Sequence, residues 1–472
     1  MVPLLHRARA VAVTTALLAA GLVASTPAGA DPVLDSCTQQ GPTLRYLVVF
    51  PQFTTAETAE AEISGACGAT TVYYPEIAVA VATSPDPSFL GLIGPQRAYS
   101  AQAEGASKRA VKRKKDDTEL LQAAGVRSGE QWDMDLINAP AAHAITTGSK
   151  SVVVGVLDSG VARHPELASA LAPELSAGCL TGKPDPSPAA WAPTTSAHGT
   201  HVAGTIAAAD DGRGITGVAP GVRIASVKVV DDDGFIYPEY AVCGFMWAAT
   251  QGMTVTNNSY FIDPYLFTCQ NAPGQRVIYE AVRRAVDYAT SRNVLNVAAA
   301  GNNAADLSRP GRDSLSPTNG DAQTRPVDPS CVVLPVQLKN VVGVSSVDAT
   351  KTKASYSSYG LGAIDVTAPG GDSRAPGGCV LSTVPSGYDY SCGTSMAAPH
   401  AAGVAALIAS THPEADAAQL GRMLNAQATT LACPADYDLY GTGVQDAFCT
   451  GYSEYNSFYG HGLVDALAAV TR

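Results

Sequence analysis

Three short segments carry residues that together can activate a hydroxyl for attack on a carbonyl group. Asp158 ends the run Val-Gly-Val-Leu-Asp, His198 opens His-Gly-Thr-His-Val-Ala-Gly, and Ser395 lies within Gly-Thr-Ser-Met-Ala-Ala-Pro-His. A serine hydroxyl is a weak nucleophile until an imidazole accepts its proton, and a buried carboxylate then fixes the tautomer of the imidazole. We therefore predict acyl-transfer chemistry, with Ser395 as nucleophile, His198 as general acid and base, and Asp158 as the orienting acid.

A fourth segment offers a donor for the charge that such an attack creates. Asn302 follows the run Val-Ala-Ala-Ala-Gly. The oxyanion formed from a peptide carbonyl is stabilised by N–H groups that already point at it. We predict that the Asn302 side chain and the backbone N–H of Ser395 supply these donors. Each residue alone has a structural alternative as a helix cap or turn, but four such segments in the order Asp, His, Asn, Ser favour catalysis.

The four segments resemble the signature blocks of the subtilisin-like serine protease family. The matching blocks are residues 157–160, 198–204, 297–302 and 393–400. The resemblance extends from about residue 131 to the C-terminus, and it implies a secreted serine endopeptidase that acts on polypeptide substrates and is made as a zymogen. It also implies that Ser259, Tyr260 and Gly301 contact the substrate.

The specificity of the expected cleft stays open. Tyr260 and Phe261 stand where well-known family members have small residues. Aromatic rings here could narrow the cleft, form an apolar wall for larger substrate residues, or pack in the core. Both broad digestion and dedicated processing of one partner protein are therefore compatible with the sequence. A secreted binding protein that keeps the fold without turnover is a further alternative, although the intact catalytic residues argue against it.

Apolar runs alternate with helical patterns through most of the chain. Runs typical of strands cover 151–157, 223–230, 253–257, 294–300 and 341–347, and helical patterns cover 198–208, 237–251, 275–291 and the stretch from 395 to before 413. We expect Pro399 in the first turn of the last helix, where its missing N–H does little harm. The alternation predicts an α/β fold with a mostly parallel sheet covered by helices on both faces, and with the catalytic residues at the carboxyl ends of the strands.

A small α+β pattern precedes this region. It consists of strands at 45–50, 71–74 and 77–82 and helices at 55–64 and 86–93. The segment resembles the inhibitory propeptide of the family, which would make the protein's own propeptide a partner of the enzyme. A free-standing accessory domain is the alternative.

The domain organisation follows from three changes in composition. Residues 1–30 are predicted to be a signal peptide, because two arginines precede a short apolar stretch and Ala-Gly-Ala supplies small residues for cleavage. Residues 31–118 are assigned to the propeptide and a basic linker, and residues 119–472 to the peptidase domain. No later segment is apolar for long enough to span a membrane. Together with the signal peptide, this predicts a secreted, extracellular protein, which we expect to be a monomer.

Charge and cysteine content agree with export. The net charge of −12 disfavours a nucleic-acid partner, because binding to phosphates requires a basic face. Ten cysteines follow the predicted signal peptide, which is typical of an oxidising compartment. We predict disulfides Cys37–Cys67, Cys379–Cys392 and Cys433–Cys449, and leave the partners of the other four cysteines open.

Two acidic segments have different expectations. Residues 209–215 resemble the calcium loop of the family, with Asp211 and the more distant Glu166 as carboxylate ligands, although two successive aspartates also suit a simple turn. A structural calcium ion is therefore compatible with the sequence, whereas the chemistry itself requires no cofactor. The run Asp231-Asp232-Asp233 is predicted to be a solvated loop.

Overall fold

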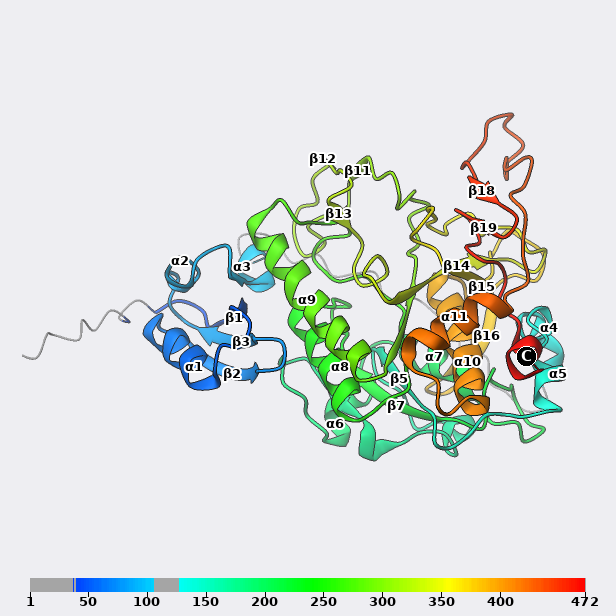
Figure 1. Cartoon of the computed structure of the whole chain (residues 1–472), viewed down its shortest axis with the longest axis horizontal. Coiled ribbons are helices and arrows are strands. Elements are labelled where there is room, and N and C mark those ends of the chain that lie inside the picture. Colours follow the sequence, from blue (N-terminus) through cyan, green and yellow to red (C-terminus); the bar gives the residue numbers. More distant parts are fainter. Residues whose placement is uncertain (1–36, 38–39, 106–126, 472) are drawn as a thin grey trace, which may run out of the picture.

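The computed structural model describes residues 37, 40–105 and 127–471 (Figure 1). The predicted signal peptide and the basic run at 108–115 lie outside these residues. A small unit formed by residues 44–105 packs against one side of a much larger α/β domain.

The α/β domain is built on a seven-stranded sheet in which every neighbouring pair is parallel. In spatial order its strands are β15 (Val366–Pro369), β14 (Val341–Val347), β10 (Leu295–Ala299), β8 (Val255–Asn258), β5 (Val153–Asp158), β7 (Arg223–Lys228) and β6 (Ala177–Gly178). The five predicted strands are all present. Their near-continuous apolar sequences suit strands that are buried on both faces, whereas β15 and β6 are too short to be recognised from such runs.

Helices cover both faces of this sheet. Alternate residues of β10 demonstrate the two layers, since Val297 packs into one hydrophobic core and Ala298 into the other. The first core contains α7 (His198–Ala207), α10 (Thr394–Thr411), α11 (Ala417–Gln427) and α12 (Ala466–Thr471), and the second contains α8 (Pro238–Thr250) and α9 (Pro273–Ser291). The predicted α/β architecture with helices on both faces is thus confirmed.

The small unit is an antiparallel sheet between two helical layers. Its strands, in the order β2 (Ala69–Tyr74), β3 (Val79–Ser84), β1 (Leu44–Val49) and β4 (Ala98–Tyr99), are joined by α1 (Ala56–Gly65) and α2 (Phe89–Ile93) and followed by α3 (Ala101–Gly105). Alternation along β1 assigns the two faces: Tyr46 and Val48 pack under the unit's own helices, whereas Leu47 and Val49 pack into the core that contains α8 and α9. Figure 1 shows this sheet between α1 and α9.

Shorter elements complete the domain. A hairpin of β16 (Val380–Val384) and β17 (Gly387–Ser391) immediately precedes α10. The remaining helices are α4 (Trp132–Leu136), α5 (Ala139–His143) and α6 (Pro188–Trp191), and the remaining short strands are β9 (Thr268–Cys269), β11 (Arg312–Asp313), β12 (Arg325–Pro326), β13 (Cys331–Val332), β18 (Gly451–Tyr452) and β19 (Tyr455–Asn456). Within the described ranges, no helix is both long and apolar enough to cross a bilayer.

Five disulfides pair all ten cysteines. The three predicted bonds are present, and the other two are Cys179–Cys243 and Cys269–Cys331. These two link cysteines 64 and 62 residues apart, so only the packing of the chain brings them together.

Candidate active site

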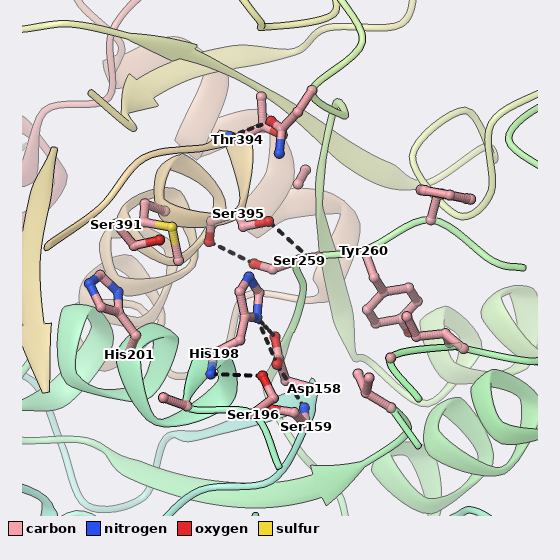
Figure 2. Close-up of a pocket in the computed structure, with 18 of the residues that line it drawn as sticks. Asp158, Ser159, Ser196, His198, His201, Ser259, Tyr260, Ser391, Thr394 and Ser395 are labelled. Atoms are coloured by element: carbon pink, nitrogen blue, oxygen red, sulfur yellow. Dashed lines mark hydrogen bonds and ion pairs between the residues drawn. The ribbon is translucent and has the colours of Figure 1, made fainter. Parts of the chain in front are cut away.

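The three predicted catalytic side chains converge at one edge of the sheet. Asp158 is the last residue of β5, His198 is the first residue of α7, and Ser395 is the second residue of α10. All three line one cavity of about 470 Å³, at the carboxyl ends of the parallel strands. Figure 2 shows the imidazole of His198 between the carboxylate of Asp158 and the Ser395 side of this cavity.

The carboxylate of Asp158 holds the imidazole of His198 by one ring nitrogen. Nδ1 lies 2.8 Å from Oδ1 and 2.9 Å from Oδ2, and the backbone N–H of Ser159 donates to Oδ1 at 2.7 Å. Because a carboxylate only accepts hydrogen bonds, Nδ1 carries the hydrogen and Nε2 is left as the basic nitrogen. Asp158 is 1% exposed and the His198 side chain 26% exposed, so a substrate can reach the ring but water hardly reaches the acid.

Ser395 and Ser259 are joined through two hydrogen bonds. The Ser395 hydroxyl donates to the carbonyl oxygen of Ser259 at 3.2 Å, and the Ser259 hydroxyl donates to the carbonyl oxygen of Ser395 at 2.8 Å. The second bond follows from the position of Pro399, which is the sixth residue of α10 and not in its first turn as expected. Because proline has no N–H, the helix cannot supply the usual donor to the carbonyl oxygen four residues earlier, and Ser259 supplies it instead.

Thr394 fixes the orientation of the Asn302 side chain. The backbone N–H and the hydroxyl of Thr394 both donate to Asn302 Oδ1, at 2.9 and 2.8 Å, and the N–H of Gly301 donates to the same hydroxyl at 3.1 Å. Since Oδ1 is engaged by two donors, the N–H₂ group of Asn302 is the part of the amide available to an oxyanion. A side chain at Gly393 would begin 3.3 Å from this nitrogen, so glycine leaves room for it.

The role of Thr394 was not predicted. The sequence indicates it only by the position of Thr394 next to Ser395. Thr394 and Asn302 are 92 positions apart, so no local pattern predicts their contact. The three residues predicted to contact substrate, Ser259, Tyr260 and Gly301, all line the cavity.

Aromatic and aliphatic side chains form one wall of the cavity. Tyr260 and Phe261 line it together with Val230 and Ile236. The Tyr260 hydroxyl donates to Asn258 Oδ1 at 2.9 Å, and burial raises the pKa of Tyr260 well above its ordinary value. The ring is therefore held at the wall of the cleft and is not free to swing.

The acidic loop 231–233 is solvated as predicted, since Asp232 and Asp233 are exposed, but it also lines the cavity. The loop directly follows β7, so it emerges at the same sheet edge as Asp158, His198 and Ser395. Asp231 accepts hydrogen bonds from the backbone N–H groups of Asp233 and Phe235, and burial raises its pKa. Asp232 lies 3.5 Å from the ammonium group of Lys228. Asp231 thus stabilises the loop itself, whereas Asp232 links the loop to the end of β7.

His201, the second histidine of the His-Gly-Thr-His motif, is buried at the wall of the cavity. Its Nε2 lies 3.2 Å from the carbonyl oxygen of Val380 and 3.1 Å from that of Asp389, so Nε2 carries a hydrogen. Burial lowers the pKa of His201 to about 3. A ring that stays neutral and is bonded to two backbone acceptors supports the structure and does not act as a base.

Glu166 and Asp211 lie at the loop that resembles a calcium site. Oε1 of the buried Glu166 accepts a hydrogen bond from the Tyr388 hydroxyl at 2.5 Å, while its Oε2 has no hydrogen-bond partner among the described residues. Burial raises the pKa of Glu166, and the charge of Asp211 raises it further. Within the described residues, no three acidic, histidine or cysteine side chains cluster closely enough to hold a metal ion. The unpartnered oxygen near a second acid nevertheless fits a cation whose other ligands are backbone carbonyls.

Comparisons with known proteins identify the family of this chain. The sequence profile of the subtilase family matches residues 149–462. Subtilisin BL from Lederbergia lenta is 34% identical over 317 residues, which cover 67% of this chain and 96% of that protein. A solved lanthipeptide protease is 27% identical, with a TM-score of 0.55 over 72% of this chain and 94% of that one.

A second solved structure resembles this chain over a longer stretch. The epidermin leader peptide processing serine protease of Staphylococcus aureus superimposes with a TM-score of 0.66, covering 91% of this chain and 99% of that one at 21% identity. The family profile and the subtilisin relatives establish the classification. The chain therefore belongs to the subtilase family of serine endopeptidases.

Proposed function

We propose that this endopeptidase hydrolyses peptide bonds through an acyl-enzyme formed on Ser395. The Ser395 hydroxyl transfers its proton to Nε2 of His198 while Oγ attacks the carbonyl carbon, and Asp158 stabilises the resulting imidazolium. Nε2 then gives the proton to the leaving amine, and a water molecule repeats the sequence to release the acid. The observation that carries this proposal is the bond between Asp158 and Nδ1, since it leaves Nε2 as the base.

The oxyanion of both steps would be held by Asn302 and Ser395. The N–H₂ group of Asn302 is available because Thr394 occupies its oxygen. The backbone N–H of Ser395 belongs to the first turn of α10, where amides have no acceptor within the helix. All groups that this chemistry needs belong to the chain, so no cofactor is required for it.

The substrates of this site are polypeptides. Ser259, Tyr260 and Gly301 are proposed to contact them, because all three line the cavity that holds the triad. Dedicated processing is a second candidate beside broad digestion. It is favoured by the fixed aromatic wall of Tyr260 and Phe261 and by the similarity to a lanthipeptide protease. A binding protein without turnover would not need His198, Asn302 and Ser395 in this arrangement.

Residues 31–118 are proposed to be a propeptide that inhibits the enzyme. Its support is the docked small unit. The Arg284 guanidinium in α9 donates to the carbonyl oxygens of Phe50 and Ile77, both at 2.9 Å, and Arg45 of the small unit lies 3.6 Å from the buried Glu239 of α8. These contacts hold the small unit against α8 and α9 of the domain that contains the cleft.

Export of a monomer follows as part of the same proposal. Ten paired cysteines fit an oxidising compartment, and residues 1–30 would be the removed signal peptide.

A structural calcium ion at Glu166 and Asp211 is also proposed. Calcium should then raise the midpoint of thermal unfolding of the Ser395→Ala protein, and Glu166→Gln should reduce that rise; an unchanged midpoint in calcium would contradict the site.

Peptide cleavage tests the proposed chemistry directly. We expect the matured protein to cut members of a peptide library, with new ends identified by mass spectrometry, and a serine-directed reagent to stop the cutting. Ser395→Ala should remove cleavage while leaving the fold intact, because alanine suits the helix. Equal cleavage by this variant would end the assignment of Ser395.

The precursor tests the zymogen proposal. If maturation is intramolecular, the Ser395→Ala precursor expressed in a protease-deficient host should begin near Asp31 after removal of the signal peptide. The separately produced segment should also inhibit the mature enzyme. A variant that instead begins after Lys115 would mean that another protease performs the cleavage.

A further inference from the structure

The residues that follow the linker contact three elements of the catalytic domain. The Gln131 side chain exchanges two hydrogen bonds of 2.9 Å with the backbone of Thr216, in the loop after α7. The indole N–H of Trp132 lies 3.4 Å from the carbonyl oxygen of Cys379, whose disulfide partner precedes Ser395 by three residues. Asp133 contacts His400 in α10 itself. We call residues 131–133 the N-terminal clamp.

The contact of Asp133 with His400 is a wholly buried pair. Both side chains are 0% exposed, and Nε2 of His400 lies 2.9 Å from Oδ2 of Asp133. The other ring nitrogen, Nδ1, lies 2.7 Å from the carbonyl oxygen of Met396, so it must carry a hydrogen. The contact between Nε2 and Oδ2 therefore needs one proton, which lies between these two atoms. Asp133 Oδ1 has no hydrogen-bond partner among the described residues, so His400 is the partner that holds the acid.

His400 acts on the weakest turn of α10. Pro399 removes the backbone hydrogen bond that would close the turn starting at Ser395. Two side chains bond to carbonyl oxygens of this turn. The Ser259 hydroxyl donates to the carbonyl oxygen of Ser395, and Nδ1 of His400 donates to the carbonyl oxygen of Met396. Asp133 fixes the His400 ring from outside the helix. These contacts connect the turn that carries Ser395 to a residue far earlier in the chain.

We propose that Asp133 and His400 are positioning residues, which fix the first turn of α10 and with it the nucleophile. The inference rests on the proposed role of Ser395. It also sets a limit on maturation, because an active enzyme must keep the clamp and so must be cut before Gln131.

Turnover per active site tests this role. The full chain is expressed and matured with Asp133→Ala, Asp133→Asn and the control Asp135→Ala, which changes an exposed acid of the same helix α4. Active sites are counted with a fluorophosphonate, and kcat and KM are measured on one peptide. We expect Asp133→Ala to lower kcat per site on the order of ten- to a hundredfold with KM changed less than about twofold, since small misplacement of a nucleophile is costly.

The conservative variant separates positioning from simple stability. The amide of Asp133→Asn can donate to a neutral Nε2, so it should restore kcat to within about threefold of the wild-type value. Asp135→Ala should leave kcat unchanged. Thermal unfolding of the same substitutions in the Ser395→Ala background reports their effect on stability.

Two outcomes would overturn the inference while leaving the peptidase intact. One is a normal kcat per site in Asp133→Ala, with the loss confined to stability or to the number of active sites. The other is an equal loss in Asp135→Ala. A wild-type protein that cuts no peptide would instead refute the proposed function together with this inference.

Discussion

Two aspartate–histidine pairs lie near Ser395, and they differ mainly in exposure. The ring of His198 is 26% exposed at the cleft, and its Nδ1 is held by Asp158. The ring of His400 is fully buried, and both of its nitrogens have protein partners. The same two residue types thus leave a basic nitrogen facing the cavity in one pair and none in the other.

The difference explains why only one pair suits catalysis. A general base needs a nitrogen that can both accept and return a proton at a reacting atom. Asp158 leaves Nε2 of His198 for that purpose, whereas Asp133 and Met396 engage both nitrogens of His400 and turn it into a fixed support. Substitutions in the first pair should therefore abolish turnover. Substitutions in the second pair should misplace Ser395 and lower turnover.

The largest effect is expected for Asp158→Asn. An amide can donate to Nδ1, which would move the ring hydrogen to Nε2 and leave no base for Ser395, so kcat should fall on the order of 10⁴-fold. Steady-state cleavage of a peptide by the purified variant measures this. A loss as small as that expected for Asp133→Ala would remove the distinction between the two pairs.

Asn302→Ala should have the next largest effect. The amide acts on charge that develops during reaction, so kcat should fall by about 10²–10³-fold, the range known for the equivalent change in subtilisin, with KM almost unchanged. The kcat and KM of the variant on one peptide test this. A change confined to KM would make Asn302 a substrate-binding residue instead.

Thr394→Val should lower kcat by about tenfold, because it removes the hydroxyl that holds Asn302 Oδ1 but keeps the shape of the side chain. The double variant with Asn302→Ala should be no slower than Asn302→Ala alone, since Thr394 acts through that amide. Additive losses in the double variant would show that Thr394 has a separate role.

The smallest effect on activity is expected for His201, whose substitution should alter stability in acid. Its pKa is lowered from 6.5 to about 3 by burial, so between these values the unfolded chain binds a proton that the folded protein does not. The stability associated with the neutral ring is therefore present above pH 6.5 and is lost as the pH falls toward 3.

In the Ser395→Ala background, His201→Gln should remove about 1.4 kcal/mol per pH unit from the slope of the unfolding free energy in this interval. Urea unfolding at several pH values measures the two slopes. Parallel slopes for the two proteins would mean that His201 is not neutral in the folded state.

The sequence predicts the central fold well because local patterns carry it. Strands such as β5 and β14 are buried on both faces and appear as continuous apolar runs, and the helix that begins at His198 ends within a residue of its predicted limit. The three local disulfides were predicted for the same reason. The short strand β15 has too few residues to stand out.

What the sequence did not predict depends on contacts between distant segments. Asp133 and His400 are separated by 267 residues, and neither lies in a pattern that indicates the other. The role of Thr394 and the position of loop 231–233 at the cleft also depend on distant segments. Both arise because several loops meet at the same edge of the sheet. The proline inside α10 is a further example. The helix tolerates it because the Ser259 hydroxyl donates to the carbonyl oxygen that proline leaves without its usual donor.

Labelling with a fluorophosphonate tests most directly whether the exposed pair activates Ser395. We expect the intact mass of the matured wild-type protein to increase by one adduct, with peptide mapping that assigns it to Ser395, and His198→Ala to remain unlabelled under the same conditions. His400→Asn, if folded, should still be labelled, although more slowly. Labelling of a different serine, or equal labelling of Ser395 without His198, would contradict the catalytic assignment.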